Sequence, residues 1–208
     1  MTLDPPRCTG ETAGGPADDR RVGWQQWSRR RHLERRLHDG AALRISALAL
    51  QLGLFRHRIP EGEADLNRSI DDLQDELHGV LQELREVAGE IYPALLDEAG
   101  LGPALREQAG RLDAAVTITA PDERFGPAAE GAAYFALIAC LETLPPGGAP
   151  VTVSARRADD ALLVVVTGAD PGHAEHFRDG AHPLGGTVDV EAGPRPGTGT
   201  ITARFPCG

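Results

Sequence analysis

The chain contains no lysine, because all 21 of its basic residues are arginines. Chemistry that needs a lysine, such as Schiff-base formation, is therefore excluded. Long apolar runs are absent as well: a stretch such as residues 47–55 falls well short of the roughly 20 residues of a membrane span. Residues 1–7 lack the apolar core of a signal peptide. We expect a cytoplasmic protein that makes no contact with a membrane.

Cysteines are few, and Cys8, Cys140 and Cys207 are too widely spaced for a disulfide framework or for paired metal ligands. The net charge of −10 argues against nucleic-acid binding, which relies on a basic surface. Yet residues 20–58 hold ten arginines against only Glu34 and Asp39. This basic stretch is either a solvated helix face or a docking surface for an acidic partner, and both interpretations stay open.

The periodicity of apolar residues predicts a helical hairpin after a flexible tail over residues 1–21. One apolar stripe runs from residue 24 to about residue 58, and a second runs from 70 to 91 and ends before Pro93. A lone hairpin leaves such stripes half exposed, so we expect a homodimer in which two hairpins form a four-helix bundle. The predicted dimer core includes Leu37, Ile45, Leu48, Leu77 and Leu84.

Beyond residue 97 the pattern changes to short β-branched runs alternating with helices. Helices are predicted over 102–112 and 130–144, and strands over 116–119, 151–155, 162–167, 187–191 and 200–205. This mixture favours a two-layer α/β sandwich, so the fold class is α+β. The predicted organisation is a tail (1–21), a dimerisation and phosphotransfer hairpin (22–97) and a sandwich domain (98–208).

His38 stands apart from the other six histidines because of its setting. It comes one position after Leu37 of the apolar stripe, so it points to the flank of the bundle, and Asp39 follows it directly. An unprotonated imidazole nitrogen can attack phosphorus while a neighbouring carboxylate takes up the proton and orients the ring. The pair His38 and Asp39 is therefore the candidate catalytic site.

The sequence around this pair, ERRLHDGAALRISAL over residues 34–48, closely resembles the phosphoacceptor helix of bacterial sensor histidine kinases that work with helix-turn-helix response regulators. The resemblance continues through residues 91–97 and 100–105 and into the C-terminal glycine motifs. It implies that the sandwich is similar to the ATPase domain of those kinases. It also implies partner-docking roles for Glu34, Arg35, Ala42 and Arg44.

The ATPase-like half departs from the family pattern at the positions that carry its chemistry. Where the family has a glutamate and an asparagine that bind magnesium and ATP, this chain has Ala139 and Thr143. Where the family has the adenine-binding aspartate, it has Gly168, and Asp170 fits that position only after a shift. We therefore expect a degenerate ATP-binding domain with no bound ATP and no metal site of its own. Leu43 likewise replaces the glutamine that positions water for dephosphorylation.

These features predict a two-component histidine phosphotransfer protein, in effect a pseudo histidine kinase. It would pass a phosphoryl group between His38 and an aspartate of a response-regulator receiver domain, which supplies the magnesium. A partner histidine kinase is a further candidate partner. Two alternatives stay open: an active or weak ATP-dependent sensor histidine kinase, and a non-catalytic dimeric binding module. The sequence leaves open whether the chain is an enzyme and in which direction the phosphoryl group flows.

Overall fold

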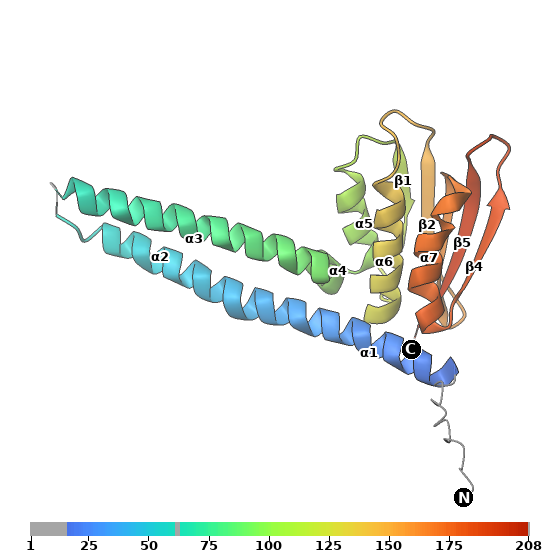
Figure 1. The fold of residues 1–208 in the computed structure, drawn as a ribbon, viewed down its shortest axis with the longest axis horizontal. Coiled ribbons are helices and arrows are strands. Elements are labelled where there is room, and N and C mark those ends of the chain that lie inside the picture. Colours follow the sequence, from blue (N-terminus) through green and yellow to red (C-terminus); the bar gives the residue numbers. More distant parts are fainter. Residues whose placement is uncertain (1–15, 61–62, 208) are drawn as a thin grey trace, which may run out of the picture.

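The computed structural model describes residues 16–60 and 63–207, which form a long helical hairpin and a domain built on a five-stranded sheet (Figure 1). The first arm of the hairpin is a continuous run of helix. It consists of α1 (Pro16–Arg35), the π-helical segment η1 (Arg36–Ala42) and α2 (Leu43–Arg56). The second arm is α3 (Ala64–Ile91). The predicted hairpin is confirmed.

The two ends of the hairpin follow local sequence rules. Helix α3 ends at Ile91 because Tyr92 precedes a proline and adopts an extended conformation, as predicted. The start of the first arm was predicted too late, since α1 already begins at Pro16. A proline suits the first turn of a helix. The tail predicted over residues 1–21 is therefore wrong from residue 16 onward, and its first 15 residues lie outside the described part.

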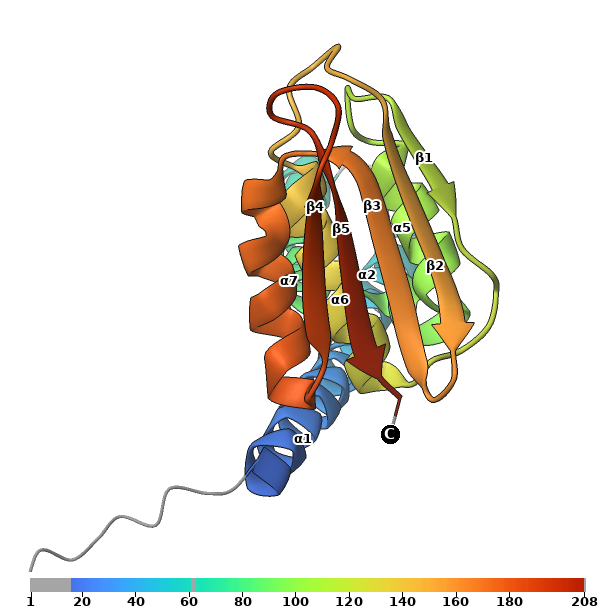
Figure 2. The same cartoon turned by 90° about the vertical axis from the view of Figure 1, so that its right-hand side faces the viewer.

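The C-terminal half is a two-layer sandwich, as predicted, with helices α5, α6 and α7 on one face of the sheet (Figure 2). The strand order is β1-β2-β3-β5-β4, in which only β1 and β2 pair in parallel. Two helices, α4 and α7, were missed. The elements are α4 (Ala94–Ala99), α5 (Leu101–Ala109), β1 (Val116–Thr119), α6 (Pro127–Leu141), β2 (Val151–Ala158), β3 (Ala161–Ala169), η2 (Pro171–His173), α7 (Ala174–Ala181), η3 (His182–Leu184), β4 (Thr187–Ala192) and β5 (Gly199–Pro206).

The core of the sandwich lies between the sheet and these helices. Alternate residues of β5 are buried, as expected for a strand with one face on a core. Tyr92 and Leu96 also belong to this core and are completely buried. The boundary predicted between residues 97 and 98 therefore falls inside α4, and the sandwich begins near Tyr92. The predicted boundary was wrong because it was set where the residue pattern changes, whereas Tyr92 and Leu96 already pack in the core of the sandwich.

Helix α1 packs against the sandwich domain as well as continuing into the hairpin (Figure 1). The ring of Trp27 stacks on Phe135 of α6 with centroids 5.7 Å apart. Gly131 makes room for this ring, because a Cβ atom there would lie 2.6 Å from it. A Cβ atom at Gly23 would similarly lie 2.5 Å from the carbonyl oxygen of Pro183. The first arm is therefore shared between the two halves, which the predicted division at residues 22–97 does not capture.

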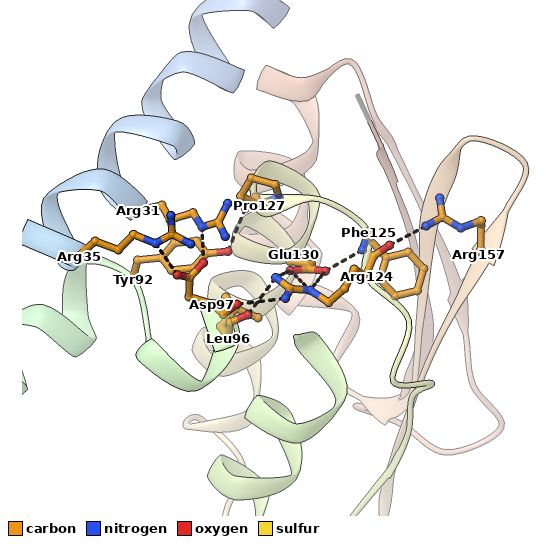
Figure 3. Close-up of polar contacts among 10 residues, drawn as sticks. All are labelled: Arg31, Arg35, Tyr92, Leu96, Asp97, Arg124, Phe125, Pro127, Glu130 and Arg157. Carbon is orange, nitrogen blue, oxygen red and sulfur yellow. Dashed lines mark hydrogen bonds and ion pairs between the residues drawn. The ribbon is translucent and has the colours of Figure 1, made fainter. Parts of the chain in front are cut away.

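A buried ion pair fixes the start of α6. Glu130 is fully buried and accepts a hydrogen bond from the backbone N–H of Phe125 at 2.6 Å. The guanidinium of Arg124 pairs with both oxygens of the Glu130 carboxylate, at 3.0 Å through Nε and 2.9 Å through Nη2 (Figure 3). A buried carboxylate is tolerated only with such partners. The loop before α6 is thus held to its first turn.

Substituting Glu130→Ala should lower the free energy of unfolding by about 3–5 kcal/mol, because it leaves Arg124 without its buried partner and empties a packed site. The matched control is Asp122→Ala, which breaks an exposed pair with Arg106 and should cost about 1 kcal/mol or less. Urea unfolding of both variants measures the difference. Equal losses in the two variants would show that the Glu130 pair does not fix α6.

Candidate functional site

His38 lies in η1, the π-helical segment that joins α1 and α2. Its side chain is about half exposed, at 49%, and that of Asp39 is 73% exposed. His38 Nδ1 lies 3.3 Å from Asp39 Oδ1. Short π-helical segments are rare and occur often at functional sites. The structure thus brings the two predicted catalytic residues together on an open surface.

The contact between these side chains determines which ring nitrogen of His38 is available. A carboxylate can only accept hydrogen bonds, so Nδ1 carries the hydrogen in this contact. In the neutral ring, Nε2 then holds the free lone pair. Because the imidazole is exposed, this nitrogen can meet an external phosphorus atom. The arrangement is therefore suited to phosphoryl acceptance at Nε2.

A cavity of about 280 Å³ opens beside His38, between η1 and α4. It is lined by Glu34, Arg35, His38, Asp39, Ala94, Asp97 and Glu98. Glu34 is only 3% exposed, and burial raises the pKa of its carboxyl group. Ala42 is 8% exposed. Both side chains are thus largely turned into the protein, a feature that the resemblance did not predict. The docking roles of Glu34 and Ala42 stay a prediction.

The other two predicted docking residues differ in their surroundings. Arg44 is exposed on α2. Arg35 is exposed too, but its Nε donates to Asp97 Oδ2 at 2.7 Å, and Arg31 contacts the other oxygen of the same carboxylate (Figure 3). The guanidinium of Arg30 lies over the ring of Trp27 at 4.9 Å. Part of the arginine-rich stretch therefore serves internal contacts and not a partner.

The predicted magnesium and ATP positions lie at the other end of α6. Ala139 has no side-chain ligand atom. Thr143 Oγ1 donates to the carbonyl oxygen of Cys140 at 2.7 Å and lies 3.0 Å from His173 Nε2, so Nε2 carries the hydrogen. His173 Nδ1 can then accept from the Cys140 thiol, whose sulfur is 3.6 Å away and whose pKa is raised by burial to about 11. These contacts join the end of α6 to η2.

The end of β3 and the loop that follows it also make internal contacts. Gly168 has φ +94°, and a Cβ atom there would lie 2.6 Å from the carbonyl oxygen of Pro150, so the backbone requires glycine. Asp170 Oδ1 accepts from the backbone N–H of Gly172 at 2.8 Å. A cavity of about 330 Å³ is lined here by Thr143, Gly168, Asp170 and His173, among others. Ala139 does not line this cavity and faces instead a groove beside Phe135.

Sequence reasoning missed the polar cluster between α1 and the sandwich, namely Asp97, Arg31, Arg124 and Glu130 (Figure 3). One signal was present: Glu130 is the only charged residue in the otherwise apolar sequence of α6. Leu43 is 59% exposed on α2 and offers no hydrogen-bonding group at the glutamine position of the family.

Within residues 16–60 and 63–207, no helix has both the length and the apolar character that a membrane span requires. The same part of the chain contains no group of three His, Cys, Asp or Glu side chains arranged to hold a metal ion.

Comparison with known proteins finds a family model that matches most of the hairpin. Residues 29–96 match the family model described as histidine kinase. The chain is similar to the crystal structure of a histidine kinase from Burkholderia phymatum STM815, at 14% identity, with 81% of this chain and 98% of that chain covered and a TM-score of 0.39. No curated protein matches. The matched segment contains the end of α1, η1 with His38, α2 and α3. Over these residues, the chain is similar to the histidine kinase family.

Proposed function

We propose that this chain is a two-component histidine phosphotransfer protein that passes a phosphoryl group between His38 and the aspartate of a receiver domain. The observation that carries the proposal is the geometry of His38. It is exposed within the family-matched hairpin, and the Asp39 carboxylate engages Nδ1 and leaves Nε2 open. We also propose that the protein works in the cytoplasm, beside a response regulator and, as a second partner, a histidine kinase.

In the forward step, Nε2 of His38 attacks the phosphorus of the receiver's aspartyl phosphate. The O–P bond of the acyl phosphate breaks, an N–P bond forms, and the receiver's aspartate leaves as a carboxylate. The proton on Nδ1 stays beside Asp39, whose negative charge stabilises the positive charge that develops on the ring. The reverse step returns the phosphoryl group to a receiver aspartate. Magnesium at the phosphorus comes from the receiver and not from this chain.

Three features of the sandwich support a reaction without bound ATP. Ala139 supplies no ligand, the hydroxyl of Thr143 is engaged by Cys140 and His173, and Asp170 accepts from its own loop. The cavity beside Thr143 and Asp170 also lies far from His38. It adjoins the C-terminal end of α6, whereas Arg35, one turn before His38, lines a cavity with Pro127 at the N-terminal end. A helix of 15 residues separates these ends by about 22 Å at about 1.5 Å per residue.

The surface of the hairpin supports a homodimer. Along its two arms, many large apolar side chains are more than 40% exposed: Leu33, Leu43, Leu48, Leu50, Leu54, Phe55, Leu66, Leu73, Val80 and Val87. Of the predicted core, Leu48 is 54% exposed, and the other four residues are half-buried. Apolar surface of this extent marks an interaction site, and a second hairpin would cover it.

Light scattering at micromolar concentration should therefore give the mass of a dimer. Leu48→Glu together with Leu73→Glu should shift the mass toward the monomer, because buried carboxylates without partners are costly. Asp72→Asn and Gln82→Glu, at exposed polar positions of α3, make a control variant that keeps the dimer. A monomeric natural chain would contradict the proposal of a four-helix bundle.

The second expectation concerns nucleotide. Calorimetry with ATP and magnesium should show no binding at micromolar concentrations. The cavity beside Thr143 is lined by no carboxamide, and the one carboxylate in its lining, Asp170, accepts a hydrogen bond from its own loop. Micromolar affinity would contradict this expectation and favour an ATP-dependent kinase.

The third expectation concerns transfer. Incubation with a labelled phospho-receiver should move label onto the natural chain and not onto His38→Gln. Asp39→Asn should slow the transfer about 10²- to 10⁴-fold, as expected for loss of a group that assists proton-coupled chemistry. Its stability should change by less than about 0.5 kcal/mol, because the side chain is exposed.

His78→Gln is the control, since His78 is exposed on α3 and its Nδ1 lies 2.7 Å from the Gln74 carbonyl oxygen of its own helix. This variant should take up label at the natural rate. Equal labelling of His38→Gln and the natural chain would refute transfer through His38 and leave the binding module as the better interpretation.

A further inference from the structure

The carboxylate of Asp97, in α4, binds two arginine side chains of α1. Its Oδ2 accepts from Arg35 Nε at 2.7 Å, and its Oδ1 accepts from Arg31 Nε (Figure 3). The Asp97 side chain is only 10% exposed, so these charge-assisted hydrogen bonds are partly shielded from water. Arg31 and Arg35 lie one turn apart on α1, so the carboxylate is hydrogen-bonded to both ends of one helical turn.

The backbone of the same residue is held by the sandwich domain. Arg124 Nη1 donates to the Asp97 carbonyl oxygen at 3.0 Å, and Arg124 Nη2 donates to that of Leu96 at 3.4 Å. Arg124 is in turn fixed by the fully buried carboxylate of Glu130. Asp97 is thus a polar link between α1 and the sandwich, in addition to the apolar contact of Trp27 with Phe135.

This junction lies directly before the reactive segment. Arg35 is the last residue of α1, and η1 with His38 begins at Arg36. Asp97 and His38 also line the same cavity of about 280 Å³. A π-helical turn is less favourable than an α-helical one and needs support from its surroundings. The bond from Arg35 to Asp97 fixes the first end of η1, and through it the relation of His38 to Asp39.

We infer that Asp97 is a positioning residue for His38, which holds the start of η1 against the sandwich domain so that the imidazole and the Asp39 carboxylate keep their contact. The chemical part of this inference rests on the proposed phosphotransfer function. The structural part rests only on the contacts of Asp97.

Hydrogen exchange of the full-length chain tests the structural part. In Asp97→Asn, backbone amides of residues 36–43 should exchange about tenfold faster or more, because a charged hydrogen-bonding partner is lost. Amides in the middle of α3 should be unaffected. The control is Glu98→Gln, the adjacent exposed acid that lines the same cavity, which should leave exchange at the natural rate. Unchanged exchange of residues 36–43 in Asp97→Asn would overturn the inference.

Chemical phosphorylation with phosphoramidate tests the positioning part without a partner protein. The P–N bond of the donor breaks, a new N–P bond forms on an imidazole, and ammonia leaves. Mass spectrometry gives the ratio of labelling at His38 to that at His57, an exposed histidine just after α2. Asp97→Asn should lower this ratio about tenfold. This is less than the 10²- to 10⁴-fold effect of removing an acid–base group, because Asp39 itself is still present.

Glu98→Gln should keep the natural ratio, and Asp97→Glu should restore most of it because the charge is retained. A natural ratio in Asp97→Asn would overturn the positioning role even if exchange rises. If Asp97→Asn does not fold, Arg35→Gln replaces it as the test. This variant removes only the contact nearest η1 and should lower the ratio in the same way. Equal labelling of His38 and His57 in the natural chain would instead contradict the proposed function, while the exchange result would still decide the structural part.

Discussion

The relation between the two halves of this protein depends on the paired charges around α4. Arg31 and Arg35 bind the carboxylate of Asp97, and Arg124 binds its carbonyl oxygen while Glu130 neutralises Arg124 (Figure 3). If any link were removed, an arginine or a carboxylate would be left in a partly dry site without its partner. Together with the stacking of Trp27 on Phe135, this cluster holds α1 on the sandwich, beside the cavity that His38 lines.

The use of arginine in place of lysine matters for this cluster. Arg124 donates to four acceptors, two on Glu130 and one each on Leu96 and Asp97, from a single planar group. A lysine ammonium has only three donors and no fixed plane, so it cannot take over this role. The arginines of α1 are likewise used in part for the fold, through Asp97 and through the ring of Trp27. If residues 20–58 dock an acidic partner, the arginines that make no such internal contact, such as Arg44, are the ones left for it.

Local pattern was enough to predict both arms of the hairpin and the five strands, because helix periodicity and β-branched runs report on near neighbours. It also singled out His38 and Asp39, whose contact is between adjacent residues. It failed wherever the partner lies far along the chain. The burial of Glu34 depends on α4, and the role of Asp97 depends on a residue 62 positions earlier. No spacing rule predicts such pairs.

The central claim is that His38 exchanges its phosphoryl group with a protein and not with a nucleotide. The most direct test starts from chain phosphorylated chemically at His38, freed of the donor and followed by phosphorus NMR. With magnesium and ADP, the phosphohistidine signal should persist and no ATP should form. With magnesium and a cognate receiver, the signal should pass to the receiver's aspartate. Formation of ATP from the charged chain would contradict the account and show that the sandwich still works as a kinase domain.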